Sequence, residues 1–287
     1  MPALGNALGL PYRKNGLGFV GALDAYLTNL VAVYSINDKL VASYNGSAVR
    51  VRRSSDNTLT DIGFLGNGDF DAASYLAFIG AGNGFAHTVY DQSGNSRHQV
   101  QATAAAQPQI GVDGNGDYYL YAPGAGFSTT KMVCSGLSIA CTDFTFWTVA
   151  GAAAYAFSTM NTRDNTAVTE RYPINYSNSI DAIFQDSVSG TVAKIGSTNT
   201  GVYSSVWSAG SSGNKLTNRL STVTGTRTAA ACTINVIGLG YAAGGATWAQ
   251  NSPWYMGAVW SVDHGPTATF AALATLGKTL IPAAQYT

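Results

Sequence analysis

Residues 144–149 read Phe-Thr-Phe-Trp-Thr-Val, and this stretch repeats with a period of two residues. The same period runs through 49–53 and 254–260, and the tyrosine-rich run 118–121 follows Asp-Gly and Asn-Gly pairs that are typical of a turn. A period of two is the spacing of a β-strand, and short strands separated by Gly, Asn and Ser turns favour packed antiparallel sheets. Alternating strand–helix units are absent, so a parallel sheet is not expected. We therefore predict an all-β fold, a β-sandwich with a few short connecting helices.

Three helices are expected in those connections. Asp69 and Asp71 precede the alanine-rich run 72–79, Ser35 precedes 36–44, and Thr267 precedes 268–280. Short acidic or hydroxyl side chains at such positions cap the free backbone N–H groups at the start of a helix.

The N-terminal segment has a different composition from the rest. Residues 1–21 are rich in glycine and show no period, which predicts an extended arm, whereas 22–287 read as one domain. We expect the part of the arm around Pro11, Tyr12, Arg13 and Lys14 to dock on a larger particle or on a neighbouring subunit.

Charge is scarce in this chain. Charged residues make up 10% and the formal net charge is zero, against about 25% charged residues in an average soluble domain. A chain with this charge balance lacks the clustered basic residues that bind nucleic acid. No apolar run reaches the ~20 residues of a membrane span. The first residues lack the pattern of a secretion signal, so we expect a product made in a cytoplasm. Glu170 is the single glutamate.

No metal or cofactor is expected. Asp113, Asn115 and Asp117 are similar to the start of a calcium loop, but Gly124 stands where the bidentate glutamate belongs, so a hairpin turn is predicted instead. The three cysteines have no zinc-site spacing. Cys134 and Cys141 either close a short loop or, together with Cys232, are free buried thiols.

Two segments carry a family resemblance. The first is Arg50-Val51-Arg52-Arg53-Ser54-Ser55-Asp56-Asn57, and the second is Val89-Tyr90-Asp91-Gln92-Ser93-Gly94-Asn95-Ser96-Arg97-His98. Together they resemble the catalytic domain of the α-L-arabinofuranosidase B family of glycoside hydrolases. The resemblance implies a concanavalin A-like jelly-roll β-sandwich. Similar segments occur in bacteriophage virion proteins that look like laminin-G or lectin modules.

The family's catalytic pair matches this sequence only in part. The resemblance implies a glutamate nucleophile, for which Glu170 is the candidate, and an aspartate acid/base after a glycine-rich strand. The matching stretch, 236–245, has Tyr241 or Ala242 at that place. The vicinal cysteine pair that forms the family's sugar platform is absent from the corresponding residues 150–155.

From these gaps we predict a non-catalytic virion structural protein of a tailed bacteriophage, a capsid or tail decoration or fibre-type protein. Its partners would be other virion proteins or copies of itself, and it would sit in a virion assembled in the host cytoplasm. Host glycans or cell-surface polysaccharide would bind Tyr241 and two tryptophans in polar loops, Trp207 and Trp248. Two alternatives stay open: a glycoside hydrolase of arabinofuranosidase type with Glu170 as nucleophile, and a free carbohydrate-binding protein.

Overall fold

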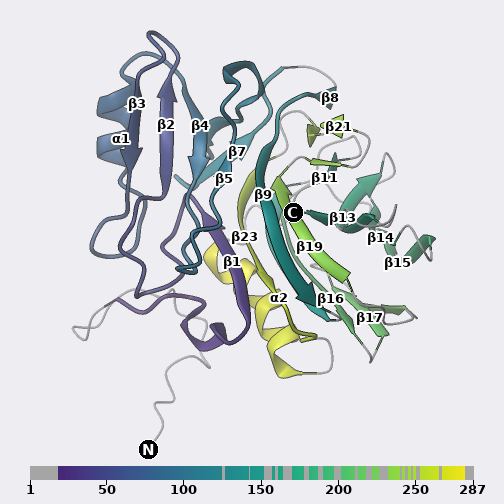
Figure 1. The fold of residues 1–287 in the computed structure, drawn as a ribbon. Helices are drawn as coiled ribbons and strands as arrows, with labels where there is room; N and C mark the ends of the chain where they lie inside the picture. Colours follow the sequence, from purple (N-terminus) through teal and green to yellow (C-terminus); the bar gives the residue numbers. More distant parts are fainter. Residues whose placement is uncertain are drawn as a thin grey trace, which may run out of the picture.

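The computed structural model describes residues 19–281 with internal gaps. The gaps are 125–126, 142, 152–156, 159–160, 164–169, 178–180, 187–189, 197–201, 211–212, 218–221, 226–231, 240, 243–244, 247, 250–252 and 265–266. Within this range the chain is built mainly of antiparallel strands, which confirms the predicted all-β sandwich (Figure 1).

The strands form two layers. In order of pairing, the first layer contains β3 (Leu59–Ile62), β2 (Val49–Arg53), β4 (Gly84–Val89), β5 (Gln99–Val100), β9 (Met132–Cys141), β19 (Cys232–Leu239), β12 (Asn161–Arg163), β13 (Glu170–Ser177), β14 (Asp181–Asp186) and β15 (Gly190–Gly196). The second contains β1 (Leu30–Ser35), β23 (Trp254–Trp260), β10 (Phe144–Gly151), β16 (Val202–Gly210), β17 (Gly213–Thr217) and β18 (Thr222–Gly225).

Shorter elements complete the fold. The hairpin of β6 (Gln109–Val112) and β7 (Tyr118–Tyr121) pairs with β4 through β6 and with β23 through β7, and so joins the layers. The others are β8 (Phe127–Ser128), β11 (Phe157–Ser158), β20 (Tyr241–Ala242), β21 (Gly245–Ala246), β22 (Trp248–Ala249), η1 (Asp24–Tyr26), η2 (Ala104–Ala106), α1 (Ala72–Ile79) and α2 (Ala268–Leu280).

Two apolar cores follow from this layering. The inner core lies between the sheets and includes Val49, Ala86, Met132 and Ile237 from the first layer and Ala32, Phe146 and Val259 from the second. The helix core lies on the other face of the second layer, where Phe270 and Leu273 of α2 pack with Val33, Trp147 and Met256. α2 lies against β16 and β10, and Figure 1 shows it beside β16. β23 is buried along its whole length because both of its faces are covered.

Two of the three expected helices are present. α1 spans Ala72–Ile79, and the side chain of its N-cap Asp71 accepts a hydrogen bond from the backbone N–H of Ser74 at 3.0 Å. α2 spans Ala268–Leu280, but the hydroxyl of Thr267 donates to the carbonyl of His264 instead of capping the helix.

The helix predicted over 36–44 is wrong. The Ser35 hydroxyl accepts from the N–H of Asn37 and closes a tight local turn. The side chain of Gln92, which lies far away in sequence, accepts from the N–H of Leu40 at 2.6 Å. The backbone donors of this segment therefore have partners outside a helix, which propensity cannot anticipate.

Trp254 and Trp260 of β23 are both buried, but they do not share one face. Trp254 belongs to the inner core and Trp260 to the helix core. Val149 of β10 pairs with Met256, but the next residue, Ala150, pairs with Trp254, so the register of β23 against β10 shifts there. This irregularity moves the alternation of side chains by one position, so the even spacing does not keep the two rings together.

The Asp91-to-His98 segment is a structural anchor. Asp91 is 1% exposed, and its carboxylate accepts from the N–H groups of Val33, Ser93 and Arg97 and from the Ser93 hydroxyl, at 2.8–3.1 Å. Gly94 adopts a φ of 86°, a left-handed turn conformation that glycine tolerates. These bonds tie the turn to β1.

Asp91→Ala is expected to lower the free energy of unfolding by about 3 kcal/mol, because it leaves the buried N–H of Val33 and three part-buried donors without their acceptor. Asp56→Ala serves as the control. Asp56 pairs with Arg53 at 2.6 Å on the surface, and an ion pair exposed to water contributes little to stability. Urea unfolding of both variants measures the difference. Equal losses would contradict the anchoring role.

Ion pairs surround the first resemblance segment. Arg50 pairs with Asp61 across β2 and β3 at 2.8 Å, and Arg53 pairs with Asp56. The side chain of Arg52 instead donates to Gln107 at 2.6 Å. The guanidinium groups are thereby engaged in holding the sheet.

The short Cys134–Cys141 loop is excluded. Both residues lie on β9, and seven residues of extended strand separate their α-carbons by about 23 Å. A disulfide requires α-carbons within about 7 Å. Cys134 is free and buried in the inner core.

Candidate active site

Glu170 is the first residue of β13, and strand register defines its neighbours. It lies opposite Arg163 of β12, which lies opposite Val236 of β19, which lies opposite Ser135 of β9. In this row Ser135 is exposed and Val236 is half-buried. The row therefore runs along the face of the sheet that is turned away from the inner core.

The adjacent row belongs to the other face. It runs from Asp186 of β14 through Arg171 and Thr162 to Ile237, which is fully buried in the inner core. Neighbouring residues of a strand face opposite sides of a sheet. Within the described strands around Glu170, Asp186 lies in the adjacent row, on the opposite face of the sheet. It is therefore not placed to share a substrate with Glu170.

The position implied for the acid/base is also removed from the Glu170 row. Tyr241 begins β20, which pairs with β21 as a separate hairpin. It follows Val236 by five residues, so the chain carries it up to about 16 Å past that row. Neither Tyr241 nor Ala242 supplies a carboxylic acid. The predicted role of Tyr241 in glycan binding stays a prediction.

The two tryptophans expected in polar loops are in strands, so that part of the prediction is wrong. Trp207 lies within β16 opposite Phe146 of β10, which is buried in the inner core. Trp248 begins β22 and pairs with Ser128. Their glycan-binding role stays a prediction. Pro11, Tyr12, Arg13 and Lys14 lie outside the described residues.

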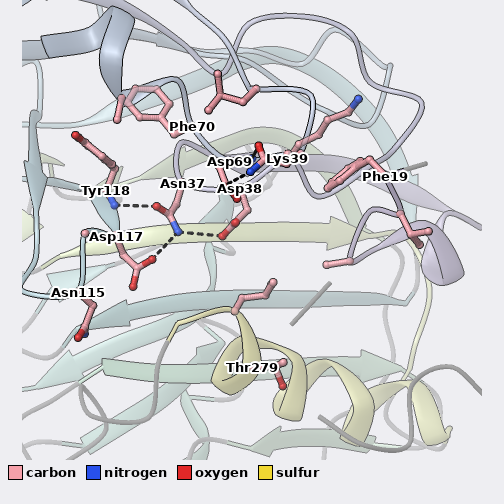
Figure 2. Close-up of a pocket in the computed structure, with 18 residues that line it drawn as sticks. Phe19, Asn37, Asp38, Lys39, Asp69, Phe70, Asn115, Asp117, Tyr118 and Thr279 are labelled. Atoms are coloured by element: carbon pink, nitrogen blue, oxygen red, sulfur yellow. Dashed lines mark hydrogen bonds between the residues drawn. The ribbon is translucent and has the colours of Figure 1, made fainter. Parts of the chain in front are cut away.

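The described residues also form a cavity of about 710 Å³, and Figure 2 shows the residues that line it. Asn37 lies at its wall: its side-chain nitrogen donates to Asp38 at 3.0 Å and to Asp117 at 3.1 Å, and its oxygen accepts from the N–H of Tyr118 at 2.9 Å. The wall comes from 19–22, 37–39, 65–72, 115–118 and 279–280. Carboxylates and amides of this kind hydrogen-bond to hydroxyl groups, but the lining residues do not include Glu170.

This cavity was not found from the sequence, because its wall comes from segments far apart in the chain. The one available signal was the spacing of Asp113, Asn115 and Asp117, which forms the predicted hairpin turn. The Asp113 carboxylate accepts from the N–H groups of Asn115 and Asp117 at 2.8 and 3.1 Å, and β6 pairs with β7. Among the described residues no group of three His, Cys, Asp or Glu side chains is placed to hold a metal ion.

Comparison with known proteins identifies the resemblance. The family described as "Alpha-L-arabinofuranosidase B, catalytic" matches residues 24–125. The chain is similar to the arabinofuranosidases. The α-L-arabinofuranosidase B of Emericella nidulans is 35% identical over 101 residues, which is 34% of this chain and 20% of that protein. The α-L-arabinofuranosidase of Hypocrea jecorina is 35% identical over 85 residues, 29% of this chain and 17% of that protein.

Solved structures extend the likeness in fold. A GH54 α-L-arabinofuranosidase, a Glu-to-Gln mutant soaked with 4-nitrophenyl α-L-arabinofuranoside, superposes with a TM-score of 0.69 at 17% identity over 93% of this chain and 66% of that one. An arabinofuranosidase complexed with arabinofuranosyl-α-1,2-xylobiose gives 0.71 at 17% identity, over 93% and 65%. At this identity the likeness shows the fold. The matched part spans about a fifth or less of the curated relatives.

These comparisons correct the function predicted from the sequence. The interpretation as a non-catalytic bacteriophage structural protein is wrong, because the relatives and structural neighbours are arabinofuranosidases. That interpretation gave too much weight to the missing acid/base and to low charge, neither of which identifies a virion protein. The expected partners and location in the cell are not tested by these similarities. No helix within the described residues is long and apolar enough to cross a membrane.

Proposed function

We propose that this protein is a glycoside hydrolase acting on α-L-arabinofuranosides, with Glu170 as its nucleophile. The likeness of residues 24–125 to the arabinofuranosidase B catalytic family carries the proposal. Glu170 is the one glutamate available for the role, and its row lies on the face of the sheet turned away from the core. A nucleophile must be reached by substrate, so this placement supports the assignment.

The register also supplies a charge partner. Arg163 stands opposite Glu170 on the adjacent strand, and side chains in such pairs are separated by about 5 Å at their β-carbons. Opposite charges at such cross-strand positions attract, so the register is compatible with a carboxylate held on this face of the sheet.

The reaction then proceeds in two steps. The Glu170 carboxylate attacks the anomeric carbon, a covalent arabinosyl ester forms, and the aglycone oxygen leaves with the bonding electrons. Water then attacks the same anomeric carbon and loses a proton to the solvent, the bond between that carbon and the Glu170 oxygen breaks, and arabinose and the free carboxylate are released. In the usual retaining mechanism a second carboxyl group protonates the aglycone and later activates the water. Tyr241 and Ala242 offer no such group, so this chain relies on aglycones that leave as stable anions.

Initial rates of nitrophenol release test the proposal. The chain is expected to hydrolyse 4-nitrophenyl α-L-arabinofuranoside above the buffer rate and to leave 4-nitrophenyl β-D-xylopyranoside and α-D-glucopyranoside untouched. Release at the buffer rate from all three glycosides would refute the proposal.

A further inference from the structure

Cys141 and Cys232 are register partners. Cys141 is the last residue of β9 and Cys232 the first of β19, and the antiparallel ladder between these strands places one opposite the other. Opposite residues of an antiparallel pair have α-carbons about 4.5–5.5 Å apart. A disulfide spans about 4.4–6.8 Å between α-carbons. We propose that Cys141 and Cys232 are a redox pair that forms a cross-strand disulfide.

The third cysteine, Cys134, is placed to resist oxidation. Cys134 is 7% exposed in the inner core, and its pKa is raised to about 11, first by burial and then by the nearby Asp91 carboxylate. The thiolate is the form that reacts in thiol–disulfide exchange, and a raised pKa makes it scarce near neutral pH. Oxidation is therefore confined to the pair at the strand ends.

The chemistry needs an external oxidant, and a small disulfide such as oxidised glutathione supplies it. One cysteine thiolate attacks a glutathione sulfur, and a mixed disulfide forms while one glutathione thiolate leaves. The second cysteine then attacks the protein sulfur and expels the other glutathione. Two protein thiols become one disulfide, and two molecules of glutathione carry away the electrons and protons.

The bond would enclose the residues between 141 and 232, which carry strands from β10 to β18, including Glu170 on β13. Closing a loop of this size restricts the unfolded chain strongly. The oxidised protein is therefore expected to melt at a higher temperature than the reduced one. This consequence does not depend on the proposed enzymatic activity.

Thiol titration of the unfolded chain, after incubation of the folded full-length protein with oxidised glutathione, tests the pair. The count with dithiobis(nitrobenzoate) is expected to fall from three thiols to one, and a non-reduced peptide map is expected to join the peptides of Cys141 and Cys232. Cys134→Ser should fall from two thiols to none. Cys141→Ser should form no intramolecular disulfide and should show no rise in melting temperature.

Two outcomes would overturn the proposal. One is a wild-type count that remains at three after oxidation. The other is loss of thiols through glutathione adducts without any link between the two peptides. Cys232→Ser is a second variant that lacks one member of the pair. It should also form no intramolecular disulfide, so the test stands even if Cys141→Ser fails to fold.

Discussion

Glu170→Gln is expected to reduce nitrophenol release from 4-nitrophenyl α-L-arabinofuranoside by at least about 10⁴-fold. The amide has nearly the same shape as the carboxylate but cannot form the ester intermediate. Removing a nucleophile or the group that activates it costs roughly 10⁴- to 10⁶-fold in a well-studied hydrolase. The initial rate at saturating substrate, compared with wild type, measures the effect.

The matched control is Asp186→Asn. Asp186 is one strand and one row from Glu170, but its row faces the inner core, so the same change of charge should alter the rate by only a few-fold. Circular dichroism spectra establish that both variants are folded. A Glu170→Gln rate close to wild type, with Asp186→Asn the damaging change, would move the nucleophile to another residue.

The second large effect concerns the leaving group. Without a general acid the enzyme should cleave aryl arabinofuranosides far faster than arabinose side chains on xylan. Protonation of a leaving group contributes about 10²- to 10⁴-fold. We therefore expect kcat/KM, which reports the first step, to fall by at least about 10²-fold between the nitrophenyl and the methyl glycoside, against a much smaller change for an enzyme that has its acid.

Restoring the missing general acid should reduce this dependence on the leaving group. Ala242→Asp places a carboxylic acid at the position implied by the family resemblance. This variant should recover activity on the methyl glycoside and should also raise the nitrophenyl rate, because the restored carboxylate activates the water of the second step. Equal kcat/KM values for the two glycosides in the wild type would show that another group already protonates the aglycone.

Local patterns in the sequence predict much of the fold. The strand at 144–149 has its period because one face meets the inner core and the other the helix core. The α1 helix is present because Asp71 satisfies its first turn. The hairpin at 113–116 forms because Asp113 bonds to the backbone two and four residues ahead. For the helix and the hairpin the deciding interaction is made within a few residues, and for the strand the period of two is itself visible in the sequence.

The features that the sequence did not predict correctly also share a cause. Residues 36–44 do not form a helix because Gln92 satisfies a backbone donor from more than fifty residues away. Trp254 and Trp260 separate because a register shift against β10 interrupts the alternation. Both depend on contacts between distant segments, which a single sequence does not display.

The candidate site was predicted in part. Glu170 could be named from the sequence because it is the single glutamate in a chain that resembles a family with a glutamate nucleophile. Its row, its partner Arg163 and the separate face of Asp186 emerge only from strand register. The pairing of Cys141 with Cys232 was missed for the same reason, since 91 residues of sequence separate them.

Intact-protein mass spectrometry tests the central claim most directly. The missing acid would also slow the second step, because the same group normally activates the water, so the ester should accumulate. Mixing the protein with 4-nitrophenyl α-L-arabinofuranoside and quenching in acid should give a mass increase of one pentosyl group, located on the peptide that contains Glu170. An unmodified protein that nonetheless releases nitrophenol, or a pentosyl group on any other peptide, would contradict the assignment of Glu170 as the nucleophile.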